Sequence, residues 1–154
     1  MKEVRDRLNG LVDISKKEIT RRKATAQAVV KLKKRVLTLI KEGQILKGDV
    51  LEQARLAGIM ASKRTSDIIP LCHPLAILDI KISFTYFNSG IRIVSYVVAM
   101  DRTGVEMEAL VACAVSALTI YDMCKMYDRS IEIADIMLLE KKGGESGELF
   151  KRKL

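Results

Sequence analysis

The stretch from Leu78 to Met100 constrains the fold more than any other part of the chain. From Leu78 to Tyr86, apolar residues alternate with polar ones, which is the pattern of a strand with one buried face and one solvent-facing face. Asn88-Ser89-Gly90 then predicts a hairpin turn in which glycine supplies a positive φ. The returning segment, Ile91 to Met100, is apolar on both faces. It is therefore expected to be a central strand of an antiparallel sheet or part of a subunit interface.

Helices are expected on both sides of this hairpin. Asp49 and Glu52 have the spacing of a capping box, in which an aspartate at the helix start accepts hydrogen bonds from early backbone N–H groups. In chain order, the expected elements are a strand from Arg22, a helix ending at Gly43, a helix from Asp49 to about Lys63-Arg64, the hairpin, a helix over Glu106 to Tyr127 and a strand over Ile131 to Leu139. This order predicts an α+β fold of the ferredoxin-like split βαβ type, with an antiparallel sheet and helices packed on one face.

Composition limits the compartment and the cofactors. The chain has 154 residues, which suits a single domain over residues 1–154. The three cysteines form no CxxC pair, so they predict reduced thiols in a cytoplasmic protein. With one His, no metal site is expected, and no bound cofactor either. The longest uncharged run, Ala109 to Tyr121, is well short of the roughly 20 residues that span a bilayer, so it predicts a buried helix rather than a membrane segment.

The charge of the chain predicts a negatively charged ligand. It carries 27 Lys and Arg against 19 Asp and Glu, a formal net charge of +8 that attracts anions. Basic clusters occur at Arg21-Arg22-Lys23, at Lys47-Gly48-Asp49 and at Lys141 to Gly147. Each alone is typical of a solvated surface, although Lys47-Gly48 also precedes a helix N-terminus that favours phosphate. Together they predict a polyanionic substrate, while charge alone leaves nucleic acid and acidic lipid open.

The loop Asp67 to Leu75 holds the only His of the chain, His73, between its two prolines. Proline fixes its own φ and restricts the residue before it, so this loop is expected to be stiff. A histidine in a stiff loop beside Lys63-Arg64 is suited to proton transfer or to phosphate contact. The alternative is a structural histidine that fills a gap or ends a helix.

Two sets of charged residues lie on the long helix. Glu106 and Glu108 lie at its N-terminus, where the helix dipole favours carboxylates whether or not they form a site. Asp122 and Lys125 follow the uncharged run and stand three residues apart. They are either a weak surface ion pair or a partly buried carboxylate and ammonium that shift each other's pKa for proton transfer.

Taken together, these segments resemble the molybdenum cofactor biosynthesis protein C family, the cyclic pyranopterin monophosphate synthases. The resemblance runs from about Val12 to Gly147, nearly the whole chain, in family order. The matching motifs are Lys47-Gly48-Asp49-Val50, Ala54 to Ile59, Ala61 to Thr65, Ile69 to Leu75, Thr103 to Leu110, Ala117 to Lys125 and Lys141 to Gly147. Residues 1–11 match nothing in the family and are expected to be an N-terminal extension, and residues 141–154 a flexible basic tail.

The resemblance implies a lyase that rearranges a cyclised dihydro-GTP, (8S)-3',8-cyclo-7,8-dihydroguanosine 5'-triphosphate, into cyclic pyranopterin monophosphate and releases diphosphate. A radical enzyme makes that substrate in the preceding step. The resemblance implies that Asp122 is the active-site acid or base, with Lys47 and Lys125 as partners in proton transfer. It also implies substrate contacts at Leu71, Cys72, His73, Met107, Glu108, Arg22 and Lys141.

The family resemblance also implies hexamers, built as trimers of dimers, with each site at a subunit interface. The two-sided apolar strand Ile91 to Met100 and the small residues Ala54, Gly58 and Ala61 point to self-association as well. We expect Lys47 to come from one protomer, and Asp122 with Lys125 from the other.

The competing hypothesis is an RNA-binding module, because RNA-recognition domains share the split βαβ order and a basic charge. Such domains carry stacking aromatics on their central strands. Here the central strand reads Ile91-Arg92-Ile93-Val94-Ser95-Tyr96-Val97, without the Gly-aromatic pattern of RNA-recognition domains. The sequence therefore favours the synthase, with no nucleic acid as partner.

Overall fold

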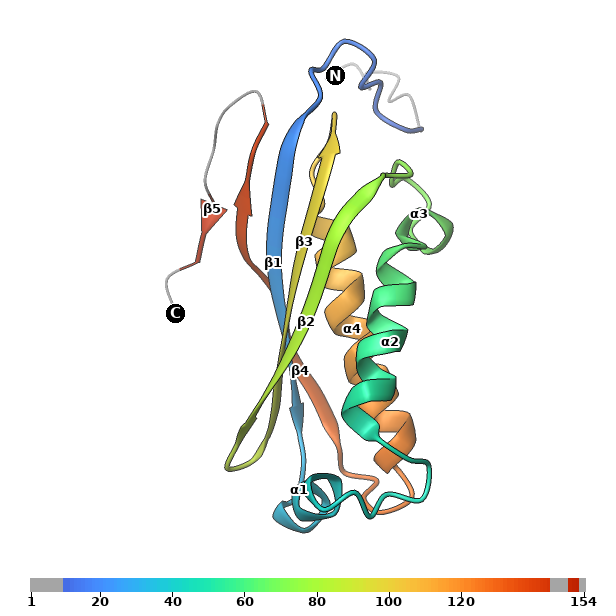
Figure 1. Ribbon diagram of the computed structural model, residues 1–154, viewed down its shortest axis with the longest axis vertical. Coiled ribbons are helices and arrows are strands. Elements are labelled where there is room, and N and C mark those ends of the chain that lie inside the picture. The colour runs from blue at the N-terminus through green and yellow to red at the C-terminus, as the bar shows by residue number, and fades with distance from the viewer. Residues whose placement is uncertain (1–9, 145–149, 153–154) are drawn as a thin grey trace, which may run out of the picture.

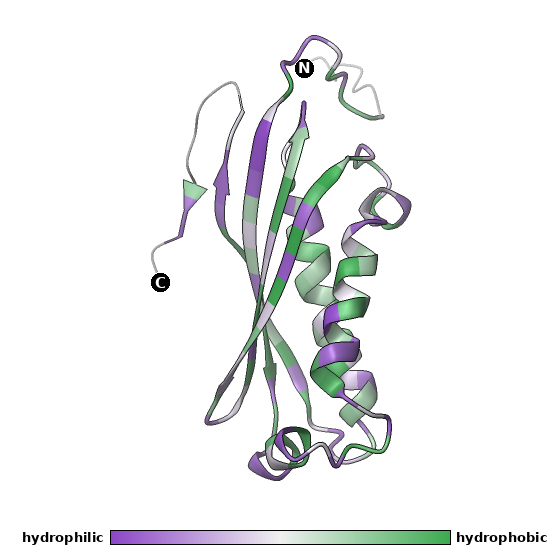
Figure 2. Ribbon diagram, viewed as in Figure 1, coloured by the Kyte–Doolittle hydropathy of each residue, from purple (hydrophilic) through white to green (hydrophobic). Residues whose placement is uncertain are grey.

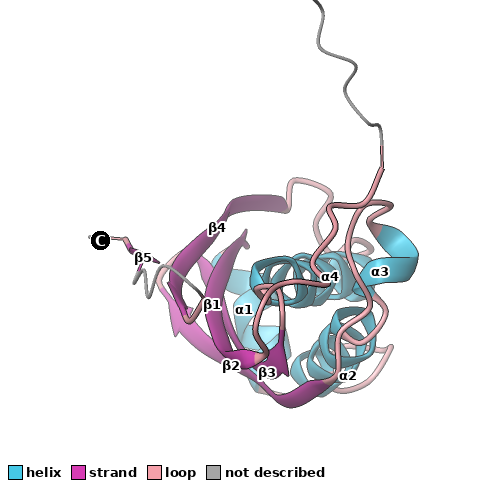
Figure 3. Cartoon of the chain, turned by 90° about the horizontal axis from the view of Figure 1, so that it is seen from above, coloured by secondary structure: helices cyan, strands magenta, loops and turns pink. Residues whose placement is uncertain are grey.

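A computed structural model of the chain describes residues 10–144 and 150–152. In chain order the elements are β1 (Thr20–Lys31), α1 (Lys34–Lys41), α2 (Val50–Ser62), α3 (Thr65–Ile68), β2 (Ile77–Phe87), β3 (Gly90–Asp101), α4 (Glu106–Cys124), β4 (Glu132–Lys142) and β5 (Phe150–Lys151). The sheet has the strand order β2-β3-β1-β4-β5, and every neighbouring pair is antiparallel (Figure 1). Helices α2 and α4 lie side by side on one face of this curved sheet (Figure 3). The predicted ferredoxin-like α+β fold is confirmed.

The two strands of the predicted hairpin are present and differ in burial as expected. β2 alternates between hydrophobic and hydrophilic residues along its length (Figure 2). β3 lies between β2 and β1, so it is an inner strand, and Ile91, Ile93 and Val97 are fully buried beneath the helices. Gly90 starts β3 but is not among the glycines with positive φ. A Cβ there would collide with the Val30 carbonyl, so close packing against β1 explains this glycine rather than the predicted turn conformation.

Helix α4 is the central helix of the core. It packs against α2 and against β1, β3 and β4. By length and composition α4 could cross a membrane. However, 56% of its apolar 18-residue stretch is buried inside the fold, which is typical of the core helix of a soluble domain. The small residues of α2 face it: Ala54 and Gly58 are buried, and a Cβ on Gly58 would meet the Ser116 side chain and the Ala112 carbonyl. This stripe therefore serves contact between α2 and α4, and the expectation that it marks self-association is wrong.

The capping prediction for α2 is half right. The Asp49 side chain accepts a hydrogen bond from the Glu52 backbone N–H at 3.0 Å, as an N-cap should. The Glu52 carboxylate does not complete the capping box, because it pairs with Arg55 Nε at 3.3 Å.

The C-terminal segment differs from its prediction. Lys141 and Lys142 are the last residues of β4, and Phe150–Lys151 forms β5 against it. The described part of residues 141–154 is therefore largely strand rather than flexible tail. Most of the predicted N-terminal extension lies outside the described residues.

Candidate active site

Five of the predicted substrate contacts line one pocket at the N-terminal end of α4. Its volume is about 270 Å³, and we call it the Glu108 pocket. The lining residues are Leu71, Cys72, His73, Leu75, Thr103, Gly104, Glu106, Met107 and Glu108. The loop between α3 and β2 supplies one wall and the first turn of α4 the other. The sequence thus identified residues far apart in the chain that meet in space.

Glu108 is the buried acid of this pocket, with 4% of its surface exposed. Burial raises its pKa to about 7, and the negative charges of Glu106 and Asp101 act in the same direction, while its own backbone amide opposes them. Burial and the charge of Glu108 also raise the pKa of the Cys72 thiol. Near neutral pH the pocket therefore offers a carboxyl that is about half protonated and a thiol that keeps its proton.

A second pocket adjoins the first and is basic. It has a volume of about 330 Å³, and we call it the basic pocket. The lining residues are Lys17, Arg22, Arg102, Thr103, Gly104, Glu106, Lys141, Gly143 and Gly144. Glu106 belongs to both pockets, and its carboxylate accepts a hydrogen bond from Lys141 Nζ at 2.6 Å. Four cations thus surround a space that opens beside the Glu108 pocket.

Local backbone structure holds Arg22 in this wall. Arg22 is only 7% exposed, and its guanidinium donates to the carbonyls of Asp101 at 3.2 Å and Arg102 at 3.1 Å. Gly143 and Gly144 have φ of +104° and +123°, which L side chains rarely adopt. A Cβ on Gly144 would collide with the Arg22 guanidinium. These glycines let the end of β4 close over Arg22.

Sequence reasoning missed two cations of the basic pocket. Lys17 lies before β1, outside the motifs that carried the resemblance, and Arg102 directly precedes one of them. Arg102 also donates to the Ser15 carbonyl at 2.5 Å and to the Lys17 carbonyl at 2.9 Å, which ties the segment before β1 to this pocket. The available signal was only that Arg102 follows a strand and precedes Thr103-Gly104.

The three residues predicted to transfer protons form one cluster at the other end of α4. Lys47 Nζ lies 2.7 Å from Asp122 Oδ2, and Lys125 Nζ lies 2.7 Å from Asp122 Oδ1. Lys47 Nζ also donates to the Asp122 backbone carbonyl at 2.9 Å. We call these three residues the Asp122 cluster. They share one chain, so the expectation that Lys47 reaches Asp122 from another protomer is wrong.

Asp122 is exposed rather than partly buried as predicted. Hydrogen bonds from Lys125 and Lys47 lower its pKa to about 2. The pairing with Asp122 raises the pKa of Lys125. At neutral pH the cluster is therefore a carboxylate held between two ammonium groups, with a net charge of +1.

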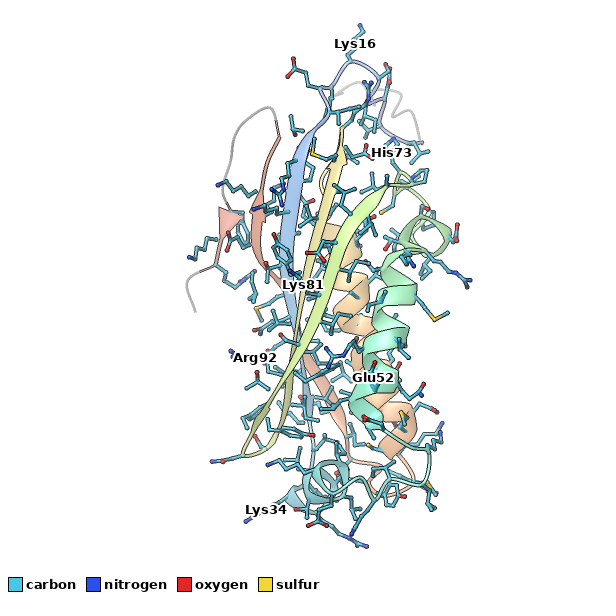
Figure 4. All side chains as sticks on the ribbon, viewed as in Figure 1. Lys16, Lys34, Glu52, His73, Lys81 and Arg92 are labelled. Atoms are coloured by element: carbon cyan, nitrogen blue, oxygen red, sulfur yellow. The ribbon has the colours of Figure 1, made fainter. Side chains whose placement is uncertain are left out.

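The pockets and the Asp122 cluster lie at opposite ends of the molecule. Asp122 lies fourteen positions after Glu108 on α4, which corresponds to about 21 Å along a helix. Figure 1 shows α4 running from the end that carries the loop before β2 to the end that carries α1, and Figure 4 shows His73 and Lys34 at these two ends. Neither pocket includes a residue of the Asp122 cluster.

A third cavity belongs to neither region. It has a volume of about 510 Å³ and lies between α1, α2 and the end of β2. Two of its cations have partners within the cavity. Lys41 Nζ lies 4.8 Å from the centre of the Tyr86 ring, and Arg55 forms an ion pair with Glu52. Within the described part of the chain, no group of three or more His, Cys, Asp or Glu side chains is placed to hold a metal ion.

Comparison with known proteins agrees with this arrangement of motifs. The MoaC family model matches residues 11–144. A cyclic pyranopterin monophosphate synthase of Heliobacterium modesticaldum is 51% identical over 143 residues, which cover 92% of this chain and 90% of that protein. The synthase of Thermoanaerobacter sp. is 51% identical over 146 residues, covering 94% and 92%, and that of Brucella ovis is 49% identical over 140 residues, covering 90% and 85%. Nothing in these similarities supports an RNA-binding module.

Proposed function

The chain belongs to the MoaC family, and from this premise we infer that it is a cyclic pyranopterin monophosphate synthase of molybdenum cofactor biosynthesis. It is a lyase that acts on a guanosine-derived substrate. The reaction converts (8S)-3',8-cyclo-7,8-dihydroguanosine 5'-triphosphate into cyclic pyranopterin monophosphate and diphosphate. The observation that carries the assignment is the pairing of a basic pocket with a neighbouring Glu108 pocket, because such a substrate has a triphosphate at one end and a purine-derived ring at the other.

We assign the triphosphate to the basic pocket. Arg22, Arg102, Lys17 and Lys141 present positive charge from three separate segments, which suits a flexible polyanion. When the internal hydroxyl of the substrate attacks the α-phosphorus, a new P–O bond forms and the bond to the β-phosphate oxygen breaks. Diphosphate leaves with the negative charge, and cations held in place beforehand stabilise that charge in the transition state. No nucleophile from the protein is needed.

The ring system is assigned to the Glu108 pocket. Glu108 has a pKa of about 7, so it can donate a hydrogen bond to a ring atom when protonated or accept one when ionised. His73, Cys72 and Met107 complete the contact surface, with Leu71 at the rim. In this proposal His73 is a substrate contact rather than a metal ligand.

The Asp122 cluster is assigned to proton transfer. Ring opening and closure require protons to move, and Lys47 and Lys125 are the acids that the cluster presents. Asp122 stays ionised near neutral pH and holds both ammonium groups in place. Because this cluster lies about 21 Å from Glu108 on its own chain, we propose that each site combines the pockets of one protomer with the Asp122 cluster of another.

This arrangement requires a homo-oligomer. We propose a hexamer built as a trimer of dimers, in which each dimer contains two such interfacial sites. We also propose that the protein is cytoplasmic and takes its substrate from a radical GTP cyclase, because the substrate is a cyclised GTP. We propose that turnover needs no organic cofactor, since the chemistry described uses only protein side chains and the substrate.

The direct test is incubation of the purified oligomer with enzymatically made cyclised dihydro-GTP. Release of diphosphate together with a cyclic-phosphate pterin is the expected result, and GTP in place of the substrate is the control and should release none. A folded oligomer that produces no diphosphate from the cyclised compound would contradict the assignment.

A further inference from the structure

Lys47 lies in a surface loop that needs an external anchor. Residues 42–49 connect α1 to α2, and the Lys47 side chain is 42% exposed. The preceding Leu46 is 81% exposed, so its side chain gives the loop no buried contact. The backbone hydrogen bonds of this loop are local: the Gln44 N–H donates to Leu39, and the Gly48 N–H donates to Ile45. Such a loop would let the Lys47 ammonium move away from Asp122.

Tyr127 supplies the anchor from the far side of the cluster. The Leu46 N–H donates to Tyr127 Oη at 2.9 Å. The Tyr127 ring is partly buried and packs against the hydrophobic core, and its own backbone N–H donates to the Cys124 carbonyl at 2.9 Å. The hydroxyl is therefore fixed to the C-terminal end of α4, the same end that carries Asp122 and Lys125.

We propose that Tyr127 is a positioning residue, whose hydroxyl holds the Leu46 amide and thereby keeps the Lys47 ammonium on Asp122. This inference rests on the proposed function of Lys47. Of the two residues before Lys47, Leu46 is joined to the body of the fold through the Tyr127 hydroxyl, and Ile45 through its buried side chain, which is 4% exposed. The buried Ile45 side chain holds the loop against the core, and the Tyr127 hydroxyl orients the backbone directly before Lys47.

Tyr127→Phe removes only the acceptor oxygen and keeps the ring in the core. With cyclised dihydro-GTP as substrate, kcat should fall roughly three- to tenfold, because one hydrogen bond to a mobile loop is lost and the reacting group is less well placed. The KM should change less than twofold, since the pockets that bind the substrate are untouched. Tyr96→Phe is the matched control: Tyr96 lies on β3, away from the cluster, and its loss of a hydroxyl should leave kcat unchanged.

A double-mutant cycle separates positioning from a general loss of stability. If Tyr127 acts through Lys47, Tyr127→Phe should lower kcat no further in a Lys47→Ala background. The same fold-loss in both backgrounds would overturn the proposal, as would wild-type kcat for Tyr127→Phe. Full turnover by Lys47→Ala alone would instead contradict the proposed role of Lys47, which is a separate failure.

Hydrogen exchange gives a readout that does not depend on turnover, and its wild-type measurement does not depend on a variant. The Leu46 N–H donates to Tyr127 Oη, and this hydrogen bond should slow the exchange of that amide. In the unmodified oligomer this amide should exchange at least tenfold more slowly than an unprotected amide, and in Tyr127→Phe it should lose that protection. Unprotected exchange of Leu46 in the wild-type oligomer would overturn the proposal.

Discussion

The two ends of helix α4 carry carboxyl groups in opposite electrostatic situations. Glu108, in the first turn, is buried, and its pKa is raised to about 7. Asp122, in the last turn, is exposed, and its pKa is lowered to about 2 by two lysine side chains. The first group can change its protonation state near neutral pH, whereas the second remains a carboxylate. When environments push two carboxyl groups apart in this way, their roles in a reaction differ.

This difference shows that the buried carboxyl and the cluster of charged side chains can lie in separate regions of one chain. The chemistry of Glu108 depends on desolvation, which the fold of a single chain provides. The Asp122 cluster has little desolvation in the single chain, and in our proposal it faces the substrate only when another protomer covers it. In this proposal the isolated chain contains two half-sites rather than one weak site.

The largest effect is expected at the exposed carboxyl. Asp122→Asn is nearly isosteric but removes the charge that holds Lys47 and Lys125, so turnover should fall by roughly two to four orders of magnitude while the fold is kept. Steady-state kinetics and circular dichroism measure the two quantities. Asp79→Asn is the matched control, because Asp79 forms a surface ion pair with Lys81 at 3.2 Å and lies away from the cluster. Substantial activity in a folded Asp122→Asn protein would remove Asp122 from the mechanism.

The buried carboxyl of Glu108 should affect the free energy of unfolding in a pH-dependent way. Its folded pKa lies above its unfolded value of 4.5, so its contribution to stability is intact below pH 4.5 and decreases as pH rises through 7. Glu108→Gln removes this titration and should raise the free energy of unfolding relative to wild type by up to about 3 kcal/mol above pH 7. Below pH 4.5 the two proteins should be nearly equally stable. Denaturant titrations at several pH values test this, and a pH-independent difference would contradict the raised pKa.

The smallest effect is expected in the basic pocket, where four cations are proposed to bind the triphosphate together. Lys141→Gln removes one of four and should raise the KM roughly tenfold at low ionic strength, with less effect as salt is added. Lys142→Gln is the control, since Lys142 is the next residue of β4 and is exposed. Equal KM values for the two variants would argue against triphosphate binding in the basic pocket.

The regular elements could be predicted because their signals are local. Alternation over Leu78 to Tyr86 and the cap at Asp49 are both present in the structure. The four-residue helix α3 and the two-residue strand β5 were not predicted, since such short elements depend on tertiary contacts rather than on periodicity. The explanation of Gly90 failed for a similar reason, because its requirement comes from β1 and not from its own turn.

The composition of the candidate site was predicted better than its geometry. Motifs identified the lining of the Glu108 pocket, but the burial of Glu108 was not predicted, because its place at a helix N-terminus also suits an exposed carboxylate. The exposure of Asp122 was not predicted. The partnership of Lys47 with Asp122 was implied, but its placement on one chain was not, because the loop of residues 42–49 reaches α4 only in the folded chain. Lys17 and Arg102 were missed because surface cations carry no periodic signal.

Subunit complementation tests most directly whether each site combines two protomers. A chain carrying His73→Ala and Lys141→Ala, with both pockets damaged, is unfolded and refolded together with an Asp122→Asn chain. In an isologous dimer with random pairing, half of the dimers are mixed and each has one intact site of two, so about a quarter of wild-type activity should return. A mixture of Lys47→Ala and Lys125→Ala chains should recover nothing, because both lysines belong to one cluster on one chain. If the first mixture stays as inactive as its separate components, the account of a site shared between protomers is contradicted.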